Sequence, residues 1–207
     1  PIWLAAAVVA STSIYYAFFA LCLIAVAGCL ESVRTRLWRP FLSAMLVCAL
    51  VTAFLVGNLA PSLLYRAESG TNSQAAARHL QESDVYALRP VQLLLPTKDH
   101  RLPAFAGLAR RYEADAAFVN ENRSSYLGLL GGIGFLFLLV TLVAGHRLIH
   151  AIPPFGVAAR INVIALGLSI AGGGGVIVGL VSSPQFRALN RISVFIAFVS
   201  IAGLMLL

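Results

Sequence analysis

The sequence predicts an all-α integral membrane protein with about five transmembrane helices and a mostly helical outer loop of about 60 residues. Of its 207 residues, 59% are hydrophobic and 11% are charged, and the mean hydropathy is +0.87. Soluble domains average about 25% charged residues, and a soluble fold of this length could not bury so much apolar surface. The apolar runs are continuous rather than alternating, which is the pattern of helices and not of barrel strands.

Five apolar runs are each about 16–28 residues long, against the ~20 residues that a helix needs to cross hydrocarbon. They extend approximately from Ile2 to Leu30, Phe41 to Tyr65, Tyr126 to Gly145, Ile161 to Val181 and Ile192 to Leu207. The first run contains polar side chains over 11–13 at mid-span depth. Residues 172–175 of the fourth run are all glycine, and each glycine weakens a helix by roughly 1 kcal/mol relative to alanine. We expect a kink or close helix packing there, or a break that lines a substrate path.

A polar loop over residues 66–124 separates two spans in residues 1–65 from three spans in residues 125–207. The loop holds eight basic and seven acidic residues, so its net charge is only +1 (8 − 7). Loops longer than about 12–15 residues usually carry function, so we expect the chemistry of this chain there. The loop sequence predicts a helix over 73–81, a helix capped by Ser83, a helix restarted at Pro90, a turn over 96–101 and an amphipathic helix from Pro103.

Arginines beside the apolar runs predict the orientation of the chain. The connections 31–40 and 146–160 carry five arginines and one acid, Glu31. Because positive residues favour the inner side, these connections are expected in the cytoplasm and the long loop outside. Arg187 and Arg191 then lie on the outer side, against this tendency, which makes them candidates for function.

The densest cluster of reactive side chains in the loop is Asp99-His100-Arg101, held between two prolines. A histidine beside a carboxylate can carry a proton, and an arginine can hold a phosphate through two parallel hydrogen bonds. We expect His100 and Arg101 to contact a phosphate and Asp99 to contact a sugar. Direct acid–base catalysis and a solvated polar turn are the alternatives.

Two further groups of polar residues lie beside the third and fifth apolar runs. Asn120 and Glu121 are expected to bind sugar hydroxyls, because amides and carboxylates suit them, with helix capping as the alternative. Arg187 and Arg191 are one helical turn apart, so both guanidinium groups could share a face. In that position they could neutralise a phosphate leaving group, or extend to lipid headgroups.

Several kinds of partner are not expected. The net charge of +7 lies mainly in short connections and not on one basic face, so nucleic acid is excluded as a partner. The three cysteines lie inside apolar runs and form neither a disulfide framework nor a CxxC pattern. His146 and His150 have a helical metal-binding spacing but no third ligand, so no metal site is expected, and no cofactor motif is evident.

Residues 11–19, 91–103, 120–128 and 187–198 resemble segments of bacterial multi-span membrane glycosyltransferases of the GT-C type. The resemblance implies an enzyme of the bacterial inner membrane that transfers a sugar from a polyprenyl-phosphate carrier to an acceptor on the outer face. The catalytic carboxylate of such enzymes usually lies in the first outer loop, near the N-terminus. We therefore expect this chain to be an interior portion of a longer protein that supplies the carrier-phosphate and acceptor side of the site.

Two other functional classes stay open. A transporter or lipid flippase would use the glycine break over 172–175 as a hinge, although no predicted span has an ionisable residue in its middle. A non-catalytic membrane subunit would contact membrane lipid and other membrane subunits of a larger complex.

Overall fold

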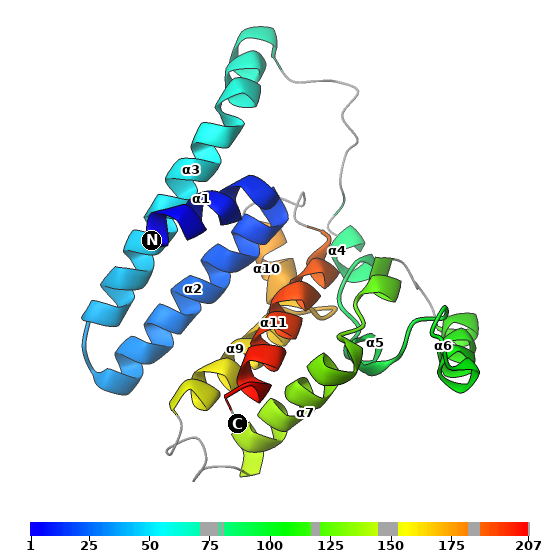
Figure 1. Cartoon of the computed structure of the whole chain (residues 1–207). Coiled ribbons are helices and arrows are strands. Elements are labelled where there is room, and N and C mark those ends of the chain that lie inside the picture. Colours follow the sequence, from blue (N-terminus) through cyan, green and yellow to red (C-terminus); the bar gives the residue numbers. More distant parts are fainter. Residues whose placement is uncertain (71–78, 80, 117–120, 145–152, 182–186, 207) are drawn as a thin grey trace. The chain divides into compact units, whose positions relative to one another are not determined.

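The computed structural model describes residues 1–70, 79, 81–116, 121–144, 153–181 and 187–206 (Figure 1). These residues form helices and connections, with one isolated bridge between Leu88 and Ile170, so the all-α fold class is confirmed for them. The contacts divide the chain into two units, Pro1–Ala77 and Arg78–Leu207. Each unit has a hydrophobic cluster of its own.

The first unit contains α1 (Ile2–Thr12), α2 (Ile14–Thr35) and α3 (Arg39–Ser69). Both α2 and α3 are long and apolar enough to cross a membrane. Helices α1 and α2 pack on α3, around the buried residues Ala6, Ala10, Ala17 and Val51. Gly28 lets α2 approach α3 closely, because a Cβ at this position would overlap the Cβ of Ala44.

The first predicted span is two helices and not one, because the chain breaks at Ser13. This residue has an extended backbone (φ −170°, ψ 149°), and its Oγ accepts a hydrogen bond from the Tyr15 amide at 3.3 Å. Serine side chains compete in this way with helical hydrogen bonding. Asn58 of α3 donates to Ala10 O at 3.2 Å and to Ser11 Oγ at 3.1 Å. The polar residues that are unusual within a span therefore form the end of α1 and the cap of α2.

The second unit is built on α7 (Gly128–Ala144), α9 (Pro153–Ser169) and α11 (Ser193–Leu204), which lie side by side (Figure 1). Each of these three helices is shorter than a typical membrane span. Their core includes the fully buried residues Leu138, Phe155 and Ala159. Asn162 Nδ2 donates to Ser200 Oγ at 2.9 Å, so a buried hydrogen bond also joins α9 to α11.

The glycine break predicted in the fourth apolar run is confirmed. Helix α9 ends at Ser169 and α10 begins at Gly174 and ends at Val181. Gly172 between them has a φ of +66°, a conformation that glycine adopts without steric cost. Helix α9 already begins at Pro153, so part of the connection expected over 146–160 is helical. Proline is favourable in a first helical turn, where its missing N–H has no partner to lose.

Short helices form in the described part of the polar loop. They are α4 (Gln81–Val85), α5 (Pro90–Leu94), α6 (Pro103–Asp115) and the 3₁₀ helix η1 (Glu121–Ser124), and a second 3₁₀ helix, η2 (Leu189–Ile192), precedes α11. Three backbone hydrogen bonds join this loop to the bundle: Leu88 N to Ser169 O at 2.7 Å, Leu127 N to Leu93 O at 3.0 Å and Asn190 N to Tyr86 O at 3.2 Å. These bonds are made to the end of α9, to the residue before α7 and to η2. These three parts of the second unit therefore lie at the same end of the bundle.

The helices predicted at Pro90 and Pro103 and the turn between them are confirmed. The predicted cap at Ser83 is wrong, because Ser83 lies inside α4 and is fully buried. Its Oγ has no hydrogen-bond partner among the described residues. The helix expected over 73–81 lies almost wholly outside the described residues.

Candidate functional site

Arg187 is held in place by the loop at the capped end of the second unit. Its Nη1 forms an ion pair with Glu82 Oε2 of α4, and the two side chains are 25% and 24% exposed. Its guanidinium carbon lies 4.8 Å from the centroid of the Tyr86 ring, the distance of a cation–π contact. The Tyr86 carbonyl accepts a hydrogen bond from the Asn190 amide. One loop segment thus orients both the guanidinium group and the backbone that precedes α11.

The sequence predicts that Arg187 and Arg191 lie one α-helical turn apart, but the structure does not place them on a common α-helix. Arg187 precedes η2, and Arg191 is a half-buried residue within it. A 3₁₀ helix has about three residues per turn, so a spacing of four does not place two side chains on one face. Asn190 between them is buried, and its Oδ1 has no hydrogen-bond partner among the described residues.

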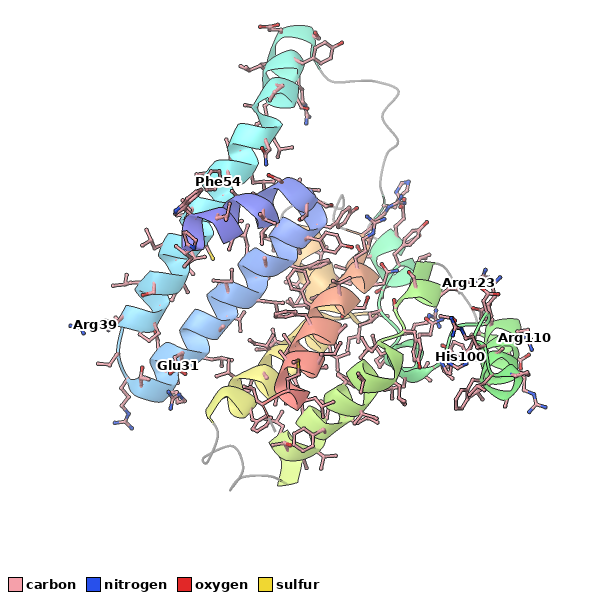
Figure 2. The ribbon with its side chains drawn as sticks, in the orientation of Figure 1. Glu31, Arg39, Phe54, His100, Arg110 and Arg123 are labelled. Atoms are coloured by element: carbon pink, nitrogen blue, oxygen red, sulfur yellow. The ribbon has the colours of Figure 1, made fainter. Side chains whose placement is uncertain are left out.

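The turn that contains His100 is organised by α6 and not by α4. His100 Nδ1 accepts a hydrogen bond from the Leu102 amide at 3.1 Å, and the imidazole ring lies edge-on to Phe105 with 5.2 Å between centroids. Arg110 of α6 donates to Lys98 O at 3.2 Å. Figure 2 shows His100 in the same region as Arg110 and Arg123. The neighbouring Asp99 and Arg101 are exposed. The two groups expected to bind phosphate are therefore held by different helices of the loop.

A small cavity of about 20 Å³ lies between α5, α6 and η1 and is lined by Gln92, Tyr112, Glu113 and Arg123, among others. Gln92 is only 5% exposed, and its Oε1 has no hydrogen-bond partner among the described residues. Arg123 Nε lies 3.5 Å from Glu113 Oε2. A buried acceptor beside a paired arginine and glutamate can bind a hydroxyl group, because a hydroxyl both donates and accepts.

Sequence reasoning missed Glu82, Tyr86 and Gln92. Gln92 gave a signal, because it is the one polar residue within the run 91–95. Glu82 could not be identified from the sequence, because its partner Arg187 lies 105 positions away.

The remaining predicted residues are not placed by the structure. Asn120, His146 and His150 lie outside the described residues, and only the backbone of Glu121, in η1, is described. No group of three potential metal ligands occurs in the part of the chain that the structure describes.

The substitution Gln92→Met separates stability from function at this cavity. We expect the melting temperature to stay the same or to rise, because the variant removes a buried acceptor that has no described partner and keeps the side-chain size. If Gln92 binds a substrate hydroxyl, turnover should fall about tenfold or more in the same variant. Thermal unfolding and an activity assay on one preparation measure both. A large loss of thermal stability would instead assign Gln92 a structural role.

Comparisons with protein-family models, with curated proteins and with solved structures find no match to this chain.

Proposed function

We propose that this chain is part of a membrane glycosyltransferase, which moves a sugar from a polyprenyl-phosphate carrier to an acceptor on the outer face of the bacterial inner membrane. The observation that carries the proposal is Arg187, oriented by Glu82 and Tyr86 just before the apolar helix α11. A guanidinium group binds phosphate through paired hydrogen bonds, and preorganised donors stabilise charge that develops on a leaving phosphate. The apolar helix beside it suits a polyprenyl tail.

A membrane location is supported by the exposure of the apolar helices. Only 6% of the most apolar 18-residue window of α3 is buried, although its mean hydropathy is 2.2. The core helix of a soluble protein would be largely buried instead. Val143 of α7 is 89% exposed and Val181 of α10 is 84% exposed. Lipid around these helices would remove their apolar surface from water.

The other candidate residues keep the roles that the sequence predicts, although α6 holds the His100 turn and α4 holds Arg187. Arg191, His100 and Arg101 are proposed to contact the carrier phosphate, and Asp99, Glu121 and Asn120 to contact the sugar or the acceptor. The base that activates the acceptor would come from another outer loop of the intact protein. A loop that is hydrogen-bonded to one end of the bundle and carries these polar groups is a suitable acceptor side for such a reaction.

The proposal is tested with the intact protein in native membranes and a panel of radiolabelled polyprenyl-phosphate sugars. We expect transfer of label and release of polyprenyl phosphate, reduced about 10²-fold by Arg191→Gln and less by Arg191→Lys. Arg111→Gln is the matched control, because Arg111 is an exposed loop arginine on α6 and should leave turnover unchanged. A folded protein that consumes none of these sugars would be evidence for the non-catalytic subunit.

A further inference from the structure

The turn between α2 and α3 forms an apolar cavity of about 350 Å³, which falls in the size range of ligand sites. Val33, Leu37, Trp38 and Phe41 line it, together with Arg36. Val33 and Trp38 are 78% and 77% exposed. The Trp38 and Phe41 rings meet edge-on with 6.3 Å between their centroids. The cavity therefore offers aliphatic and aromatic surface that the first unit itself leaves uncovered.

Local hydrogen bonds and capping fix the shape of this turn. Ser32 Oγ accepts a hydrogen bond from the Phe41 amide at 2.8 Å, which joins the end of α2 to the start of α3. Arg36 ends α2 in the left-handed conformation, with φ 55° and ψ 27°. One hydrogen bond thus links the two helix ends beside the cavity, and the left-handed residue reverses the direction of the chain there.

The turn that forms the cavity is basic, and Arg36 is among the residues that line the cavity. Residues 31–39 contain three arginines and one glutamate, a net charge of +2 (3 − 1). Glu31 is already paired with Arg34, through a bond of 2.7 Å from Nε to Oε2. Arg36 and Arg39 are exposed and form no ion pair with the described residues. Figure 2 shows Glu31 and Arg39 at the same end of the α2–α3 pair.

We propose that this turn binds one anionic diacyl phospholipid, with the headgroup phosphate at Arg36 and Arg39 and an acyl chain against Trp38. Charge complementarity favours this occupant, because a zwitterionic headgroup brings a cation as well as a phosphate to the two arginines, whereas an anionic headgroup brings a net negative charge. Tryptophan is also enriched at the depth where headgroups meet acyl chains. The inference is independent of glycosyl transfer and requires only that α2 and α3 lie in a bilayer.

Trp38 itself can report the bound lipid, because the chain has only two tryptophans. Trp3→Phe leaves Trp38 as the single tryptophan of the chain, which is excited selectively above the tyrosine absorption. The variant is reconstituted in vesicles with brominated acyl chains that quench tryptophan on contact. Brominated phosphatidylglycerol is compared with brominated phosphatidylcholine at equal mole fractions. We expect roughly tenfold preferential quenching by phosphatidylglycerol, which weakens as salt is raised.

The double substitution Arg36→Gln and Arg39→Gln should abolish this preference while quenching by phosphatidylcholine persists. Arg66→Gln is the matched control, because Arg66 is an exposed arginine in the last turn of α3, and the preference should remain. Equal quenching by the two lipids in the Trp3→Phe protein would overturn the proposal. So would protection of Trp38 from both lipids, since that result would mean that a protein surface covers the turn.

Discussion

Reversing the charges of the Glu82–Arg187 pair is expected to restore stability without restoring sugar transfer. Each single change, Glu82→Arg or Arg187→Glu, places two like charges together in a site that is about three-quarters buried. We expect each to cost about 2 kcal/mol, between the ~0.5 of a surface pair and the ~4 of a buried one. The double variant rebuilds the pair in the opposite sense, so its melting temperature should return towards that of the wild type.

Activity should not return in the reversed pair, because the phosphate would then meet a carboxylate where Arg187 stood. Transfer should stay about 10²-fold below wild type in the double variant, whereas Glu82→Gln, which removes only a positioning residue, should lose less. The exposed Glu31–Arg34 pair provides the control, and its reversal should change neither quantity. If the reversed Glu82–Arg187 protein transferred sugar at the wild-type rate, Arg187 would be structural only.

Gly134→Ala is expected to destabilise the second unit by about 1–3 kcal/mol, because the added methyl group has no space. A Cβ at this position would overlap the carbonyl oxygen of Ser200 and would lie 2.8 Å from its carbonyl carbon. Both atoms belong to the backbone of α11, so α7 and α11 must separate to relieve the overlap. The separation would also strain the buried hydrogen bond between Ser200 and Asn162. Thermal unfolding should show a fall of roughly 5 °C.

Gly167→Ala is the opposite case on the neighbouring helix α9. A Cβ there would meet no atom within 4 Å, so the change should stabilise by about 0.5–1 kcal/mol through helix propensity alone. If the melting temperature falls for Gly134→Ala and rises for Gly167→Ala, the cost of the first change comes from the close approach of α7 to α11 and not from the loss of a glycine as such. Equal and small shifts would contradict the close approach at Gly134.

Features determined by local chemistry were predictable from the sequence. The break near Gly172 and the helices that begin at Pro90 and Pro103 follow from the backbone preferences of glycine and proline. The break at Ser13 was missed because apolar residues on both sides maintain the hydropathy of a single span. The sequence predicts a helix cap at Ser83, but this residue lies buried inside α4.

The partner of Arg187 could not be predicted, for a different reason. Several acidic residues of the loop were available, and only the three-dimensional course of the chain selects Glu82. The sequence likewise suggested a common helical turn for Arg187 and Arg191, which the 3₁₀ geometry of η2 excludes. Positions that depend on contacts between distant segments are therefore where the candidate site departs from expectation.

Two hydrogen bonds from the polar loop hold the corner between α9 and α10. Asp84 Oδ1 accepts a hydrogen bond from the Gly172 amide at 2.9 Å, and the Leu88 amide donates to Ser169 O at 2.7 Å. Both bonds bind main-chain atoms at the corner, so a change in the angle between the two helices would break them together. These two bonds link the corner to the segment 84–88, so a movement of this segment would disturb both of them. A corner held by two hydrogen bonds is better suited to form a fixed wall of a binding site than to act as the hinge of a transporter.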